Sequence, residues 1–168
     1  DVNYGTAVHA DKWIPIIPNT DAALQLAIAY IWITEGTYDK EYVATHVVGF
    51  DKFEQYVLGK EDGVPKTPKW ASEKTGIPSR IIKALARAWA SKTTSTVHAN
   101  GGNMARSPYS HENMRLEVCL LGMQGLGKPG VSIWGTAQGV PYDASFDFPG
   151  YASWGINNRL AQRPMVNP

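Results

Sequence analysis

The chain has 168 residues, of which 43% are hydrophobic and 18% charged, and its 16 basic residues nearly balance its 15 acidic ones. This composition is typical of a folded domain with a buried core and excludes a disordered chain or a coiled coil. A net charge of +1 gives no electrostatic argument for nucleic-acid binding. The single cysteine excludes a disulfide framework, a CxxC redox pair and an iron–sulfur site built from cysteines of this chain.

Neither a membrane span nor a targeting signal is indicated. The longest apolar run, residues 22–33, has about 12 residues, whereas a membrane span needs about 20. No basic stretch followed by an apolar one marks a signal peptide at the N-terminus, and nothing indicates a compartment. Because the chain begins at Asp1 without a methionine, we expect it to be a piece of a longer protein.

The first element expected is a short extended segment at residues 13–17, which Pro15 excludes from the centre of a sheet. Residues 19–21 (Asn-Thr-Asp) are all N-cap types and stand directly before a helix over 21–35. This helix is apolar on nearly all sides, which predicts burial on several of them. Gly36 is the expected C-terminal cap.

The rest of the chain divides into helical and irregular parts. Four further helices are expected before residue 90, over 40–46 (after the cap Asp39), 52–58, 68–74 and 78–89, with a turn-rich connection at 59–68. The β-branched run 93–99 predicts a strand, and a helix follows over 110–124. From residue 131 onward no dependable periodicity is present, and Gly, Pro and aromatic residues dominate.

The alternation of these elements predicts an α/β fold. We expect residues 1–135 to form a Rossmann-like portion, with helices around a small, mostly parallel sheet. Residues 136–168 are expected to be an irregular tail that packs on a domain outside this chain, because so long an irregular segment is uncommon in a free-standing domain.

The strand–Gly-Gly–helix unit around Gly101 and Gly102 is the main candidate for ligand binding. Glycines at the carboxyl end of a strand let a ligand approach the backbone, where N–H groups favour anions. The spacing matches neither GxGxxG nor GxxxxGK[ST]. On these residues alone, an ordinary turn is the favoured interpretation.

Two aspartates have alternative interpretations. The carboxylates of Asp1 and Asp21 could each accept two hydrogen bonds from a guanine-type edge. Asp21 can also cap the following helix, and its position directly before the apolar run favours this second interpretation. Asp1 could simply be a solvated chain end.

No residue pattern indicates a catalytic group or a metal site. The histidines His9, His46, His98 and His111 lack metal-ligand spacing. Cys119, among apolar neighbours within a helix, is expected to be a small core residue and not a metal ligand. The catalytic residues are therefore unassigned, and no metal ligand is expected.

A series of motifs resembles the molybdopterin oxidoreductases of the dimethyl sulfoxide reductase family. The segment Trp13–Leu24 is similar to the family signature W-x-P-I-x-P-G-T-D-A-A-L. The resemblance extends in order to about residue 135, through Glu35-Gly36-x-Tyr38-Asp39, Val48-Gly49-Phe50-Asp51, Thr67-Pro68-x-Trp70-Ala71, Thr75-Gly76-Ile77-Pro78 and Gly125-Leu126-Gly127-Lys128-Pro129-Gly130. The stretch Asn103–Asn113 is most similar to the branch containing pyrogallol–phloroglucinol transhydroxylase, which includes non-redox chemistry.

The resemblance implies an interior piece of a catalytic subunit that holds molybdopterin guanine dinucleotide with molybdenum or tungsten. The implied reaction is redox chemistry, or oxygen or hydroxyl transfer, on a small substrate. The implied cofactor-binding residues are Asp1 at the end of a nucleotide-binding strand, Asn19, Thr20 and Asp21 on the guanine side, and Gly101, Gly102, Asn103 and Met104 near the pterin. Asn19 replaces the glycine that is commoner in the family.

Other parts of the enzyme are implied to lie outside this chain. The resemblance places the cysteines of a 4Fe-4S cluster and the metal-ligating residue upstream. The implied partners are the remaining domains of the same subunit and an iron–sulfur electron-transfer subunit. The alternatives are a stand-alone α/β module that binds a nucleotide or small ligand, and a structural spacer within a complex. The length of the complete gene would distinguish these hypotheses.

Overall fold

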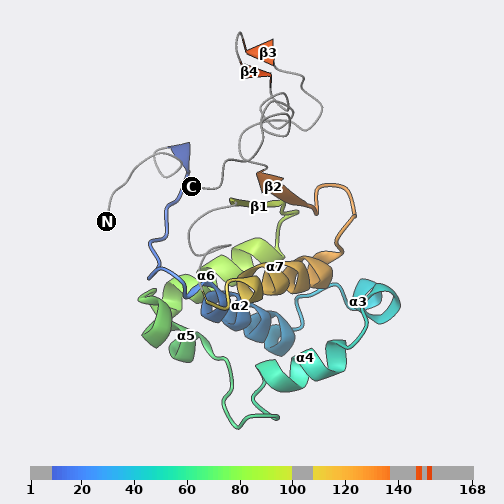
Figure 1. Ribbon diagram of the computed structural model, residues 1–168. Helices are drawn as coiled ribbons and strands as arrows, with labels where there is room; N and C mark the ends of the chain where they lie inside the picture. Colours follow the sequence, from blue (N-terminus) through green and yellow to red (C-terminus); the bar gives the residue numbers. More distant parts are fainter. Residues whose placement is uncertain (1–8, 100–107, 137–146, 149–150, 153–168) are drawn as a thin grey trace, which may run out of the picture. The chain divides into compact units, whose positions relative to one another are not determined.

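Helices account for most of the structure in this computed structural model, which describes residues 9–99, 108–136, 147–148 and 151–152 (Figure 1). The helices are α2 (Asp21–Glu35), α3 (Lys40–His46), α4 (Phe50–Val57), α5 (Pro68–Thr75), α6 (Ser79–Ala90) and α7 (His111–Gln124). The strands are β1 (Thr96–Ala99), β2 (Ile133–Thr136), β3 (Asp147–Phe148) and β4 (Tyr151–Ala152).

Helix α2 is the centre of the core. It packs against α4, α5, α6 and α7, which surround it in Figure 1. Ala27, Ile28 and Trp32 on this helix are at most 1% exposed. The prediction that this apolar helix is buried on several sides is therefore confirmed. Among the described residues, no helix has the length and apolar character needed to cross a bilayer.

Two tryptophans and a glutamine join α2, α6 and α7. The Trp32 indole N–H donates to the carbonyl oxygen of Ala86 (2.8 Å), and the two indole rings of Trp32 and Trp89 meet edge to face at 5.4 Å. The Trp89 indole N–H donates to Gln124 Oε1 (2.6 Å), and Gln124 Nε2 donates to the Trp89 carbonyl (2.8 Å). We call these four residues the indole hub. It fixes the C-terminal parts of three helices to one another.

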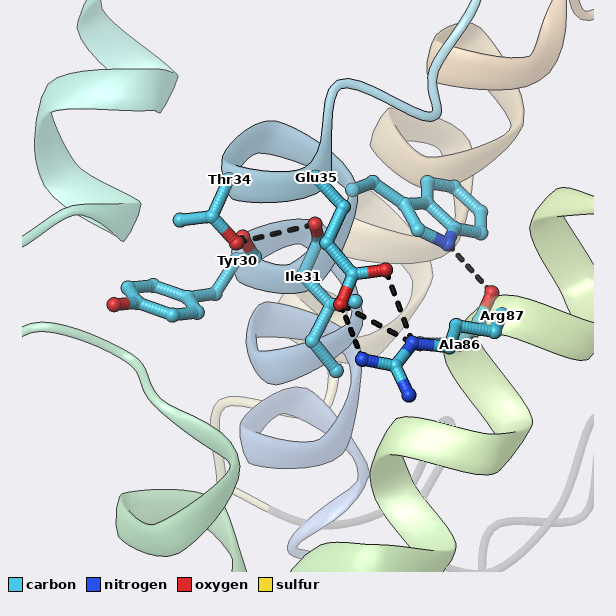
Figure 2. Close-up of polar contacts among 7 residues, drawn as sticks. Tyr30, Ile31, Thr34, Glu35, Ala86 and Arg87 are labelled. Atoms are coloured by element: carbon cyan, nitrogen blue, oxygen red, sulfur yellow. Dashed lines mark hydrogen bonds and ion pairs between the residues drawn. The ribbon is translucent and has the colours of Figure 1, made fainter.

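An ion pair lies at the surface of the same three-helix junction. Arg87 Nη2 approaches Glu35 Oε1 at 2.7 Å, and Arg87 Nε lies 3.1 Å from both carboxylate oxygens (Figure 2). The hydroxyl of Thr34, the residue before Glu35, donates to the Tyr30 carbonyl at 2.8 Å and lies 3.2 Å from the Ile31 carbonyl, the contact whose dashed line is visible in Figure 2. The last turn of α2 is thereby tied both to itself and to α6.

Local capping signals account for several helix boundaries. The Asp39 carboxylate accepts a hydrogen bond from the Tyr42 amide (3.0 Å) at the start of α3. The Thr67 hydroxyl accepts from the Trp70 amide (3.1 Å), and Pro68 occupies the first turn of α5. Gly36 ends α2 with φ of 66°, in the left-handed region that glycine tolerates. The helices predicted from these signals are confirmed.

The predicted α/β fold is wrong. The described strands are two to four residues long and form two separate two-stranded ladders, β1–β2 and β3–β4, in place of one parallel sheet. The predicted strand 93–99 is reduced to β1, whose Thr96 amide donates to the Ser132 carbonyl (2.9 Å). The core forms without a sheet because the apolar surface of α2 is buried by other helices.

The chain divides into two compact units, Asp1–Gly135 and Thr136–Pro168. In the second unit, β3 and β4 pair antiparallel, with Asp147 opposite Ala152 and Phe148 opposite Tyr151. The sequence did not predict this hairpin. The proposal that residues 136–168 pack on a domain outside the chain stays a prediction.

Candidate cofactor-binding site

The loop before α2 and the first residue of the helix carry three of the residues predicted to bind the cofactor. Asn19 has φ of 68°, in the left-handed region that glycine adopts freely and asparagine tolerates better than other residues. This backbone conformation gives a physical reason why glycine is commoner at this position in the family that the sequence resembles. Asparagine is the substitution expected to cost least there.

Thr20 and Asp21 begin the helix. Thr20 occupies the N-cap position but makes no side-chain cap, because its hydroxyl donates to the Ile17 carbonyl (2.6 Å). Asp21 is the first helical residue and is half-buried. The interpretation of Asp21 as the cap of α2 is therefore wrong. Its carboxylate lies in the first turn, where the positive end of the helix dipole stabilises a negative charge.

The end of α5 holds this loop in place. The Ile17 amide donates to the Thr75 carbonyl (3.0 Å), and the Ile17 side chain lies against Gly76, where an added Cβ would be 3.4 Å away. Thr75 is fully buried, and its hydroxyl donates to the Ala71 carbonyl (2.8 Å) and accepts from the Ile77 amide (3.2 Å). The loop is thus anchored to a rigid part of the core.

The N-terminal ends of α2 and α7 lie at the same end of the core. The indole hub joins the C-terminal parts of the two helices through α6, and the Asp39 amide after α2 donates to the Met123 carbonyl near the end of α7 (2.8 Å). Because α2 and α7 also pack together, both helices direct their N-terminal ends away from the hub. Two partial positive charges therefore face the same end, which suits an anionic group.

Buried polar atoms are also found in this half of the helices. Asn113, in the first turn of α7, is 3% exposed, and its Nδ2 has no hydrogen-bond partner in the described part of the chain. Gln25 Oε1, in the second turn of α2, is likewise buried and unpartnered there. A buried polar atom without a partner costs about 1–3 kcal/mol, so such atoms are rare unless something else satisfies them.

Asn113 is a candidate site residue that was not predicted from the sequence. Asn113 precedes Leu116 by three positions and Leu120 by seven, which is the spacing of one helix face. Leu116 and Leu120 are buried. A polar residue on an otherwise apolar helix face is the signal that could have identified it.

The other predicted site residues lie outside the described residues. These are Asp1 and the loop residues Gly101, Gly102, Asn103 and Met104. Their roles stay predictions. The described segment resumes at Pro108, three residues before α7 begins.

Cys119 lies in the middle of α7 and is half-buried. Burial raises the pKa of its thiol, while the nearby Arg115 charge acts in the opposite direction. A thiol with a raised pKa is a poor metal ligand, because metals bind the thiolate. Within the described residues, no three His, Cys, Asp or Glu side chains come together as a metal site.

Comparisons with known proteins identify homologous segments of much larger proteins. The chain is 48% identical over 160 residues (93% of its length) to "Pyrogallol hydroxytransferase large subunit" of Pelobacter acidigallici, of which it covers 18%. It is 39% identical over 120 residues to "Trimethylamine-N-oxide reductase" of Haemophilus influenzae and 40% identical over 114 residues to "Dimethyl sulfoxide/trimethylamine N-oxide reductase" of Rhodobacter capsulatus. These two matches cover 71% and 67% of this chain and 14% of each relative.

Among solved structures, the chain is similar to acetylene hydratase from Pelobacter acetylenicus, with 34% identity and a TM-score of 0.41 over 47% of this chain and 10% of that chain. No protein-family model matches the chain. The chain spans less than one fifth of the length of the curated relatives described above.

Proposed function

This chain belongs to the molybdopterin enzymes of the dimethyl sulfoxide reductase family, and we propose that it is the part of a large catalytic subunit that holds a molybdopterin guanine dinucleotide. The cofactor would lie across the N-terminal ends of α2 and α7. The complete subunit would act on a small substrate, and its metal ligand and 4Fe-4S cluster would be held by parts outside this chain.

The observation that carries the proposal is the shared direction of α2 and α7, together with the polar groups at that end. Asp21 suits the guanine base, because a carboxylate accepts hydrogen bonds from a donor edge that carries two N–H groups. The N-terminal end of α7 suits an anionic part of the cofactor, such as its diphosphate. Asn113 Nδ2 is a buried donor without a partner among the described residues, which fits a site completed by a bound polar group.

In this proposal the residues of the chain bind and orient the cofactor and carry out no chemical step themselves. Asp21 would accept hydrogen bonds from the base, left-handed Asn19 would keep the loop turned toward it, and Asn113 would donate to the bound group. The bound cofactor supplies a molybdenum or tungsten centre for electron exchange or for transfer of oxygen or hydroxyl groups. Identity to the hydroxytransferase is 48%, against 39% and 40% for the two reductases, which favours hydroxyl transfer by the complete enzyme.

The test is Asp21→Asn in the full-length large subunit, with Asp51→Asn as a matched control. Both aspartates lie in the first turn of a helix, but Asp51 belongs to α4 and is exposed. Loss of a charged hydrogen-bond partner costs about 1.5–3 kcal/mol, which corresponds to roughly tenfold or more in affinity. We expect the molybdenum or tungsten and pterin content per subunit to fall in Asp21→Asn and to be unchanged in Asp51→Asn.

A different result would change the assignment. If Asp21→Asn lowers the melting temperature but retains the full metal and pterin content, Asp21 only stabilises the first turn of α2. That outcome, repeated for Asn113, would favour a structural spacer over a cofactor-binding segment.

A further inference from the structure

An apolar groove of about 380 Å³ lies on the flank of α7, away from the candidate cofactor site. It is bounded by the C-terminal half of α7 on one side and by α3, α4 and their connection on the other. Its lining includes Val48, Phe50, Phe53, Val118, Cys119 and Met123. Every residue that lines it belongs to the described part of the first unit.

Two valines on the lining of the groove are exposed. Val48, between α3 and α4, is 100% exposed, and Val118 on α7 is 45% exposed. An exposed apolar patch next to a cavity is typical of an interaction surface. The lining contains no Asp, Glu, Lys or Arg, and His46 is its one basic residue. The chemistry of the groove therefore suits an uncharged, apolar partner.

We propose that this groove receives an apolar segment of the same large subunit, from a part that lies outside this chain. The inference rests on the proposed function, in which this chain is one part of a larger catalytic subunit. The alignment with the hydroxytransferase large subunit includes 93% of this chain but only 18% of that protein, so most of its length lies outside the aligned region. That remaining length can supply a segment that packs on this unit.

The position and size of the groove argue against the other occupants. Val118, Cys119 and Met123 lie in the C-terminal half of α7, whereas the proposed cofactor residues lie at the N-terminal end, so the cofactor does not cover the groove. A stable interface with a second copy would involve about 20–30 residues on each side, whereas twelve residues line this groove. One inserted loop or helix turn fits it better.

The test is chemical labelling of the full-length, cofactor-loaded large subunit after Val48→Cys. The matched control is Val64→Cys, because Val64 is also exposed (42%) but does not line the groove. Both variants are treated with a maleimide, and the modified peptides are quantified by mass spectrometry. In the native subunit we expect position 48 to react about tenfold or more slowly than position 64, since a covered thiol reacts only during local opening. In urea the two rates should converge.

A photo-cross-linking amino acid at position 48 identifies the occupant. A cross-link within one polypeptide, to an apolar peptide outside the aligned region, would support the proposal. A cross-link to a second copy or to another polypeptide would overturn it, as would equal labelling rates at positions 48 and 64. Metal and pterin content is measured separately with Asp21→Asn, so failure of the labelling test leaves the cofactor proposal standing, and the reverse also holds.

Discussion

The two ends of the α2, α6 and α7 group satisfy their polar groups in different ways. At the C-terminal end, both indole N–H groups and both polar atoms of Gln124 have partners within the chain. In the N-terminal half, Gln25 Oε1 and Asn113 Nδ2 are buried without partners among the described residues. Within the described residues the polar groups of the hub are satisfied by one another, whereas the other end would gain stability if another group bound there.

This contrast predicts that one end of the helix group determines the stability of the fold and that the other end determines cofactor binding. Burial of an apolar indole that is also hydrogen-bonded stabilises the fold directly. A buried amide without a partner has the opposite effect, and a bound ligand that satisfies it removes the cost. Substitutions at the hub should therefore change the free energy of unfolding, and substitutions at the other end should change cofactor content.

The largest effect is expected for Trp32→Ala in the hub. Trp32 is fully buried, so its truncation leaves a cavity and removes the hydrogen bond to the Ala86 carbonyl, and should cost about 3–5 kcal/mol. The measurement is urea unfolding of the cofactor-free subunit. Trp13→Ala is the control, because Trp13 is 44% exposed and its loss should cost much less. Equal decreases in the free energy of unfolding for the two variants would show that the indole hub stabilises the fold no more than an exposed tryptophan does.

Asn113→Leu should act on the two properties in opposite directions. An apolar side chain of similar size removes the buried, unpartnered Nδ2 group, so the melting temperature of the cofactor-free subunit should stay the same or rise. Loss of the donor should lower cofactor affinity by about 1–3 kcal/mol, or roughly tenfold. Metal and pterin analysis beside thermal unfolding tests both. A lower melting temperature with full cofactor content would contradict the proposed difference between the two ends of the helix group.

Asn19 tests how far the loop conformation matters. With φ of 68°, Asn19→Val should cost about 1–2 kcal/mol, because a β-branched residue is strained in the left-handed region. Asn19→Gly should be close to neutral in stability and should retain cofactor content. Both variants are compared by thermal unfolding and by pterin content. If Asn19→Val matches the wild-type protein in both measurements, this backbone conformation is not required.

The smallest expected effect is a pH dependence at the hub end. Hydrogen bonding to Arg87 holds the pKa of Glu35 below its ordinary value of 4.5. The pair therefore stabilises the fold above pH 4.5, and this contribution is lost as the pH falls through the lowered pKa of the folded state. Glu35→Gln and Arg87→Met should each flatten the decline in melting temperature between pH 5 and about pH 3. The change is small because solvent screens the exposed pair.

Much of the local structure could be predicted from the sequence. The helix boundaries follow from short-range signals, such as Asp39 and Thr67 as caps, Pro68 in a first turn and Gly36 at a C-terminus. The fold class could not be predicted, because it depends on which surfaces α2 meets. Those contacts join residues far apart in sequence, such as Trp32 with Ala86, which are 54 positions apart.

The location of part of the candidate site could also be predicted, whereas the roles of its residues stay predictions. Asn19, Thr20 and Asp21 could be selected because they match the family signature at residues 13–24, and the structure places them together at the start of α2. Thr20, and not Asp21, occupies the N-cap position, and its hydroxyl donates to the Ile17 carbonyl and makes no cap. No residue pattern specifies either feature. Asn113 was missed because a polar residue on the buried face of α7 can be recognised only when it is known which face of that helix is buried.

The indole hub also has a consequence for the order in which the protein is made. Gln124 follows Trp89 by 35 residues, so ribosomal synthesis delivers α2 and α6 well before α7. Until α7 emerges, the nascent chain presents the indole of Trp89 without its amide partner and the apolar side of α2 without its last cover. Completion of this core therefore waits for the synthesis of α7, and a nascent chain stalled before residue 124 exposes apolar surface of the kind that chaperones bind.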